Sequence, residues 1–86
     1  MQPTDEMLIS QICAQDEVAF ATLFARYRSA MTRHIEKTVR DAVVTEDLVQ
    51  ELFLRVWTHA AQWDNRGSVR AWLYRIGTNL TLNHLR

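Results

Sequence analysis

One segment of the chain carries apolar residues at helical spacing over about five turns. Apolar side chains recur there every three or four positions, at Phe20, Leu23, Phe24, Tyr27, Met31 and Ile35. Side chains at this spacing share one face of a helix, and that face must be covered by other helices. The 86-residue chain holds only two glycines and one proline, so few breakers interrupt it. We therefore expect an all-α fold, a compact bundle of three or four helices.

Residues that cap helices stand where each helix of this bundle would begin. The expected N-caps are Thr4, Asp16, Thr45 and Ser68. Segment 39–44, VRDAVV, is expected to be the loop before the third helix, and segment 64–67, DNRG, to be a turn. The buried sides expected on the first, third and fourth helices are Leu8, Ile9 and Ile12; Val49, Leu52, Phe53, Val56 and Ala60; and Val69, Leu73, Ile76 and Leu80.

Several classes of protein are disfavoured by what the sequence lacks. The single cysteine, Cys13, cannot form an internal disulfide, which indicates a reducing compartment. No apolar run approaches the ~20 residues that span a bilayer, and the N-terminus does not resemble a signal peptide. We therefore expect a cytoplasmic protein that is not inserted in a membrane.

The sequence also lacks motifs that are common in enzymes. The sequence has no H-E-x-x-H motif, no glycine-rich phosphate loop and no Cys/His cluster. The three histidines, His34, His59 and His84, fall on different expected helices and have no cysteine partner. We expect no catalytic activity, no metal site and no cofactor.

The charges are divided unevenly along the chain, although the formal net charge is zero. Residues 1–51 hold nine acidic and five basic side chains, whereas residues 52–86 hold one acidic and five basic side chains. Such asymmetry suggests a polyanion as the partner of the C-terminal part. A chance distribution in a short chain is the alternative.

The expected fourth helix has polar flanks on both sides of its apolar stripe. One flank holds Ser68, Trp72, Arg75, Asn79, Asn83 and Arg86, and the other holds Arg70, Tyr74, Gly77, Thr81 and His84. Arginine binds phosphates, asparagine donates to and accepts from base edges, and tryptophan stacks on bases. These flanks predict a nucleic-acid surface. The alternatives are a core role for Trp72 and ordinary solvated charges at Arg70 and Arg75.

The expected third helix exposes a different set of side chains, on the side away from its apolar stripe. These are Asp47, Gln50, Glu51, Leu54 and Trp57. A polar and acidic strip that ends in Leu and Trp is typical of a protein-binding face, and its acids disfavour DNA. The alternative is a solvated face with Trp57 packed on a neighbouring helix.

Three motifs together carry a family resemblance. EDLVQELFLRVW, AQWDNRGS and AWLYRIGTN, in this order, resemble region 2 of bacterial sigma factors of the extracytoplasmic function (ECF) group. The similarity extends back through DEVAFATLFARYR, so it covers almost the whole chain. The resemblance implies a helical bundle that takes part in transcription initiation. It also implies two partners: the clamp helices of the RNA polymerase β′ subunit, and the −10 promoter element, which region 2 recognises and opens.

The resemblance assigns residues to both partners. The polymerase-binding positions would be Asp47, Gln50, Glu51, Leu54 and Trp57. A loop over residues 62–68 would capture a base flipped from the non-template strand, with Asn79 beneath it. The DNA-binding positions would be Trp63, Asn65, Arg66, Ser68, Arg70, Trp72, Arg75, Asn79 and Asn83. Trp72-Leu73 keeps only the first of two aromatics that housekeeping sigma factors place here, so strand opening should depend more on base capture.

The resemblance leaves the extent of the protein and its regulation as expectations. Nothing in residues 1–86 matches region 4, the second domain of ECF factors, so we expect a region 2 fragment of a longer protein. An anti-sigma factor is a further partner that the resemblance allows. A helical protein-interaction module without DNA binding is the alternative function. A helix-turn-helix regulator is disfavoured, because the turn signal of that motif is missing from residues 39–67.

Overall fold

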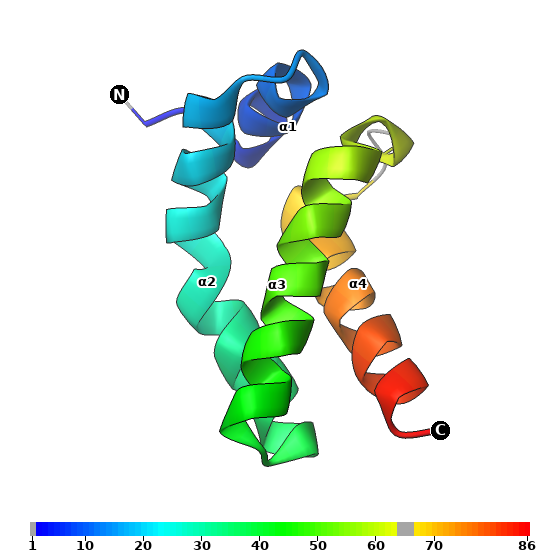
Figure 1. Ribbon diagram of the computed structural model, residues 1–86. Coiled ribbons are helices and arrows are strands. Elements are labelled where there is room, and N and C mark those ends of the chain that lie inside the picture. Colours follow the sequence, from blue (N-terminus) through cyan, green and yellow to red (C-terminus); the bar gives the residue numbers. More distant parts are fainter. Residues whose placement is uncertain (1, 64–66) are drawn as a thin grey trace.

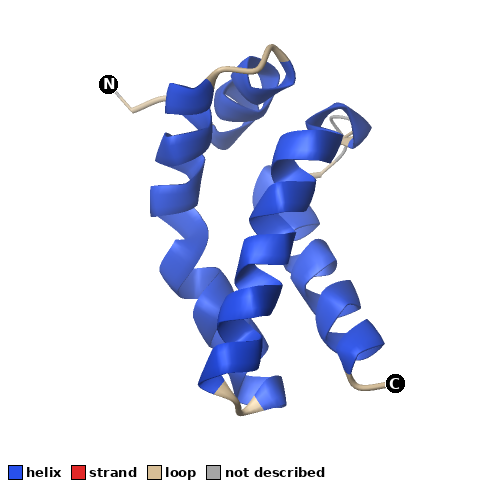
Figure 2. Cartoon of the chain, viewed as in Figure 1, coloured by secondary structure: helices blue, strands red, loops and turns tan. Residues whose placement is uncertain are grey.

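A computed structural model describes residues 2–63 and 67–86 of the chain. These residues form α-helices and a short 3-10 helix but no strand, which confirms the all-α prediction (Figure 2). The elements are α1 (Asp5–Cys13), α2 (Glu17–Val39), α3 (Ala42–His59), η1 (Ala60–Gln62) and α4 (Val69–His84). α2 packs against α3, α4 packs against both, and α1 covers one end of the bundle (Figure 1). Within the described residues, no helix is long and apolar enough to cross a membrane.

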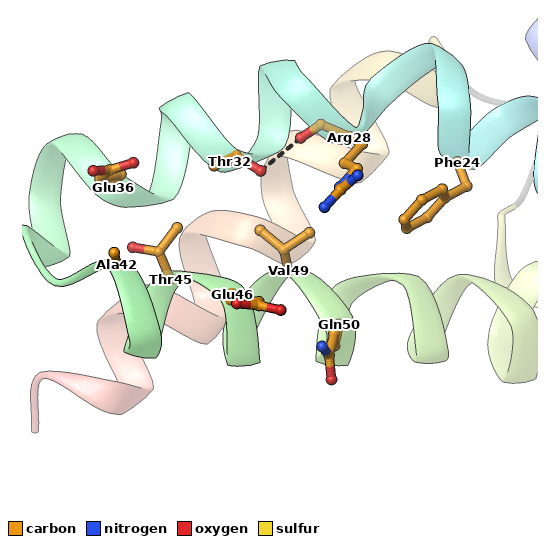
Figure 3. Close-up of a pocket in the computed structure, with 9 residues that line it drawn as sticks. All are labelled: Phe24, Arg28, Thr32, Glu36, Ala42, Thr45, Glu46, Val49 and Gln50. Carbon is orange, nitrogen blue, oxygen red and sulfur yellow. Dashed lines mark hydrogen bonds between the residues drawn. The ribbon is translucent and has the colours of Figure 1, made fainter.

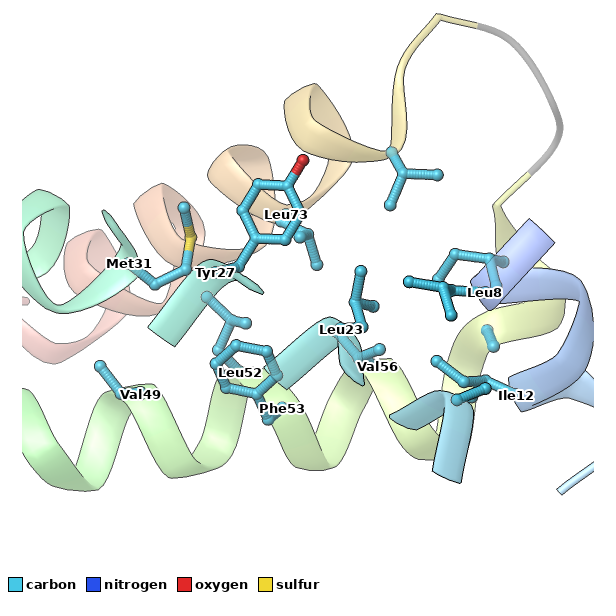
Figure 4. Close-up of a cluster of buried hydrophobic side chains, with 14 of the residues drawn as sticks. Leu8, Ile12, Leu23, Tyr27, Met31, Val49, Leu52, Phe53, Val56 and Leu73 are labelled. Carbon is cyan, nitrogen blue, oxygen red and sulfur yellow. The ribbon is translucent and has the colours of Figure 1, made fainter. Parts of the chain in front are cut away.

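The core is built from the apolar faces that the sequence predicted. Leu23, Met31 and Ile35 of α2 are fully buried, and they meet buried residues of α1, α3 and α4 (Figure 4). Of the expected core positions, only Phe20, Phe24 and Ile76 are half-buried, at the edges of this cluster. Each large apolar side chain that is fully buried contributes roughly 1.5–3 kcal/mol.

Three of the four expected N-caps are confirmed. The Thr4 hydroxyl accepts from the Met7 amide at 3.1 Å, and one Asp16 carboxylate oxygen accepts from two amides at the start of α2. The Ser68 hydroxyl accepts from the Ala71 amide at 3.0 Å. Each bond satisfies an amide that has no partner inside its helix. The cap at Ser68 also fixes where the arginine-bearing helix begins.

The prediction that Thr45 caps the third helix is wrong. α2 ends with Arg40 in the left-handed conformation (φ 57°), and the Arg40 amide donates to the Glu36 carbonyl at 2.8 Å. Asp41 then caps α3, with its carboxylate accepting from the Val44 amide at 3.0 Å. The connection is therefore Arg40-Asp41 rather than segment 39–44, and α3 begins one turn earlier than expected. Thr45 lies inside α3 and is buried.

Gly77 allows α4 to pack closely against α2 and α3. A Cβ atom added at Gly77 would lie 3.3 Å from both His34 Cδ2 and Leu52 Cδ1, tighter than ordinary contacts. One turn later, Thr81 is buried and its hydroxyl donates to the Gly77 carbonyl at 2.9 Å. The expectation that Gly77 and Thr81 belong to an exposed flank is therefore wrong, because both positions face the interior. Of the other members of that flank, Arg70 and His84 are exposed and Tyr74 is half-buried.

Candidate nucleic-acid and protein interfaces

Five of the expected DNA-binding residues lie on one side of α4. We call Ser68, Trp72, Arg75, Asn79 and Asn83 the α4 strip. All are exposed except Trp72, which is half-buried and packs against the core. Their spacing of three and four positions along one helix places them on one face. The strip thus presents a guanidinium, two carboxamides and a hydroxyl to solvent beside a fixed aromatic ring.

The charged side chains of α4 are basic. α4 contains no acidic residue. Among the described residues, the ion pairs join Arg26 to Asp5 and Arg55 to Glu51, and neither involves an arginine of α4. The positive charge of Arg75 is therefore not compensated by a paired carboxylate in this part of the chain. An anion can approach the strip without displacing an existing partner.

A groove of about 540 Å³ runs between α3 and α4 beside the strip. Trp72 and Ile76 line its α4 side, and residues of α3 such as Glu51 and Leu54 line the other side. Trp72 therefore has one side against the core and another at the groove. The groove is also where the α4 strip meets the exposed face of α3.

Trp63 lies at the end of η1. This side chain is half-buried and, with residues of α1 and η1, lines a pocket of about 470 Å³. Its indole Nε1 is buried and has no hydrogen-bond partner among the described residues. Asn65 and Arg66, which are expected to contact the flipped base, lie outside the described residues. The structure therefore describes the expected 62–68 loop at its two ends, residues 62–63 and 67–68.

Arg70 does not belong to the α4 strip, although it was expected to contact DNA. It is exposed, and its guanidinium lies 5.3 Å from the ring centroid of Tyr74. Tyr74 in turn contacts His34 of α2, with ring centroids 4.8 Å apart. Arg70 therefore lies on the flank of α4 that faces α2. The expected DNA-binding residues of α4 thus fall on two separate faces.

The residues expected to bind polymerase occupy the outer side of α3. Asp47, Gln50 and Leu54 are exposed, and Leu54 retains 55% of its accessible surface. Glu51 is half-buried and pairs with Arg55 at 3.4 Å. Trp57 is half-buried and contacts Phe20 edge-to-face, with ring centroids 5.3 Å apart. This contact holds the Trp57 ring against α2, as the alternative interpretation expected.

Val43 extends this surface by one turn and was missed in the sequence. It is 71% exposed and lies in the first turn of α3. Positions 43, 47, 50, 54 and 57 are spaced by four, three, four and three, so they share one face. Asp41, a good capping residue, was the signal that could have placed Val43 in the helix. We call this enlarged set, with Glu51, the α3 face.

A second groove, between α2 and α3, borders the α3 face. Its volume is about 280 Å³, and Figure 3 shows the residues that line it from the two helices. Arg28 lies over the Phe24 ring at 5.7 Å, and Thr32 donates to the Arg28 carbonyl. Gln50 extends from α3 at the rim, so the α3 face continues into this groove (Figure 3).

Two groups have shifted pKa values, and both lie away from the α4 strip and the α3 face. Burial, reinforced by the hydroxyl's hydrogen bond to Asp5, raises the pKa of Tyr27 to about 12. Burial also lowers the pKa of His34, and the charge of Lys37 acts in the same direction. The described residues contain no cluster of ligands that could hold a metal ion.

The chain is similar in sequence to known proteins. Residues 23–86 match the family described as Sigma-70 region 2. The ECF RNA polymerase sigma factor SigK of Mycobacterium sp. (strain KMS) is 35% identical over 82 residues, which cover 94% of this chain and 39% of that protein. SigK of Mycobacterium tuberculosis (strain ATCC 25618 / H37Rv) is 30% identical over 82 residues, which cover 94% of this chain and 41% of that protein. The chain thus spans well under half the length of these relatives.

Proposed function

Because the chain belongs to the sigma-70 region 2 family and, as the resemblance predicted, is an ECF-type region 2, we propose that it recognises and opens promoter DNA for RNA polymerase. The α3 face would bind the clamp helices of the β′ subunit. The α4 strip, with the 62–68 loop, would bind the non-template strand of the −10 element. The observation that best supports this division is the separation of charge, since acids lie on the α3 face and α4 has none.

The α4 strip has the chemistry for a single strand. The Arg75 guanidinium binds phosphate, and the Asn79 and Asn83 carboxamides offer both a donor and an acceptor to a base edge. Extruding a base costs a few kcal/mol. Stacking returns about 1–3 kcal/mol per base, so the domain alone should bind duplex weakly and prefer an open strand. A fixed Trp72 ring favours this role, because little side-chain entropy is lost on binding.

The α3 face has the chemistry for a protein helix. Val43 and Leu54 supply exposed apolar anchors, and Asp47 and Gln50 supply polar contacts around them. Trp57 is held in place by Phe20 before any partner arrives. The carboxylates of this face repel a phosphate backbone, so they favour basic side chains on the partner.

The DNA assignment is tested by removing the two polar groups at the centre of the strip. Arg75→Ala with Asn79→Ala should weaken binding to a fluorescein-labelled −10-like single strand by roughly tenfold or more, since a good base-edge contact discriminates by about 1–3 kcal/mol. Fluorescence anisotropy with that strand and with a scrambled strand measures affinity and selectivity. Arg28 lies on the side of α2 that faces α3, away from the α4 strip. Arg28→Ala is therefore the control and should bind the strand normally. Full affinity and selectivity in the double variant would contradict the assignment.

The polymerase assignment is tested on the other face. Gln50→Ala with Glu51→Ala should reduce capture of the chain by immobilised polymerase core, because it removes polar contacts at the centre of the α3 face. The same variant should bind the single strand normally. The Arg75→Ala and Asn79→Ala variant is the matched control and should be captured like the parent chain. Normal capture of the α3 variant would refute this half of the proposal.

A further inference from the structure

A second basic surface lies on the flank of α4 that faces α2. It gathers three exposed cations, Arg33 and Lys37 from α2 and Arg70 from α4. Around them lie three further polar side chains of the two helices, His34, Tyr74 and Thr78. We call these six residues the α2–α4 cluster. None of the α2 members was expected to take part in binding from the sequence.

Contacts between the two helices hold this cluster in shape. The Tyr74 ring contacts two other members, with His34 edge-to-face at 4.8 Å and the Arg70 guanidinium 5.3 Å from its centroid. His34 Nε2 and Thr78 Oγ1 are hydrogen-bonded at 2.9 Å. These contacts sit beside the close approach of α4 at Gly77. The cluster is therefore part of the α2–α4 packing rather than a chance meeting of long side chains.

The surface between these residues is a shallow hollow of about 170 Å³. Ala30, Arg33, His34, Lys37 and Tyr74 line it. A hollow this small and open does not enclose a small-molecule ligand, which usually occupies a cleft of roughly 300 Å³ or more. It can receive one anionic group that belongs to a larger, extended molecule.

The cluster carries positive charge without acids to balance it. Neither ion pair within the described residues involves Arg33, Lys37 or Arg70. The nearest acid in the α2 sequence, Glu36, lines the groove between α2 and α3 on the other side of that helix. The cluster also lacks the carboxamides of the α4 strip, so it offers cations and hydroxyl-bearing groups but few means of reading base edges.

We propose that the α2–α4 cluster binds the phosphate backbone of the DNA that the α4 strip recognises, extending the DNA path from α4 onto α2. This inference rests on the proposed function and adds α2 to the DNA-binding surface. Phosphate contacts of this kind position a nucleic acid without selecting its sequence. The α4 strip would select the bases while the α2–α4 cluster would supply affinity that depends on salt.

The test removes the two α2 cations and measures salt dependence. Arg33→Ala with Lys37→Ala should lower the affinity for a −10-like and a scrambled single strand by the same factor. The slope of log K against log salt should become shallower by about 1.4, since each phosphate contact on a single strand contributes about 0.7. Arg28→Ala, on the side of α2 that faces α3, removes a charge from another surface and should leave the slope unchanged. Arg33→Lys with Lys37→Arg keeps both charges and should retain the parent slope.

The outcomes separate the inference from the proposed function. A parent chain that prefers the −10-like strand, together with an unchanged slope in the Arg33→Ala and Lys37→Ala variant, would overturn the inference alone. A loss of affinity confined to the −10-like strand would also overturn it, because the cluster would then read bases. A parent chain that binds neither strand at low salt would contradict both proposals. Circular dichroism of each variant checks that the helices remain folded.

Discussion

At the scale of single residues, Thr45 places a hydroxyl without a hydrogen-bond partner in the described interior. Its side chain is 1% exposed, and its hydroxyl has no hydrogen-bond partner within residues 2–63 and 67–86. A hydroxyl buried without a partner costs about 1–3 kcal/mol. The residue thus lowers the stability of the bundle at the point where α3 faces α2.

Thr45→Val should raise the free energy of unfolding by about 1 kcal/mol, because valine keeps the shape of the side chain and removes the unpaired hydroxyl. Urea denaturation measures the change. Thr81→Val is the matched control, since the Thr81 hydroxyl is buried but donates to the Gly77 carbonyl. We expect the control to lower stability by about 0.5–1.5 kcal/mol. A Thr45→Val protein less stable than the parent would contradict the account.

His34 links the stability of the bundle to pH. Burial and Lys37 lower its pKa in the folded chain, so below the ordinary histidine pKa the unfolded chain binds the proton more readily. The free energy of unfolding should therefore fall as the pH drops from about 7 through about 6.5, the ordinary value, toward the lower folded pKa. Above that range His34 should contribute no pH dependence.

Urea denaturation at pH 7.5 and pH 5.5 tests this linkage. His34→Gln should show a smaller loss of stability between the two pH values than the parent, because glutamine does not titrate. Asn83→Gln, at an exposed position of α4, replaces a side chain that does not titrate and should lose as much stability as the parent. An equal loss in the parent and in the His34→Gln variant would show that His34 is not responsible.

At the scale of the helices, the position of α4 depends on Gly77. Gly77→Val should lower the free energy of unfolding by about 1–3 kcal/mol, because the added carbons would overpack against His34 and the fully buried Leu52. Helix propensity alone gives the opposite expectation, since glycine is the poorer helix former. Urea denaturation therefore separates the two effects by sign. A more stable variant would mean that α4 does not need this close approach.

The sequence predicted most of each helix because apolar periodicity and capping residues act locally. Leu8, Val56 and Leu73 are buried as expected, and Asp16 and Ser68 cap the helices that they were expected to cap. These features follow from the spacing of residues within one helix. They do not require knowledge of which helices are neighbours.

The errors arose where the outcome depends on a neighbouring element or on an uncommon backbone conformation. Arg40 takes a left-handed conformation that glycine usually adopts. The short turn before α3 therefore has no glycine that would have marked it in the sequence. Thr81 was assigned to a polar flank, but it is buried where α4 packs on the rest of the bundle. The α2–α4 cluster was missed for a related reason, since Lys37 and Tyr74 are far apart in sequence and meet only through helix packing.

At the scale of the whole molecule, the bundle separates two surfaces of different chemistry. α3 and α4 pack against each other, and their exposed sides meet along the groove at Trp72 and Leu54. The uneven charge along the chain thus becomes an uneven charge in space, with acids on the α3 face and none on α4.

The central claim is that the α3 face and the α4 strip serve different partners at the same time. The most direct measurement is the anisotropy of a labelled −10-like strand, saturated with the chain and then titrated with polymerase core. We expect the anisotropy to rise above its plateau with the parent chain, and the rise to be much smaller with Gln50→Ala and Glu51→Ala, or with a scrambled strand. Release of the strand as polymerase core is added would contradict the claim, because the two partners would then compete for one surface.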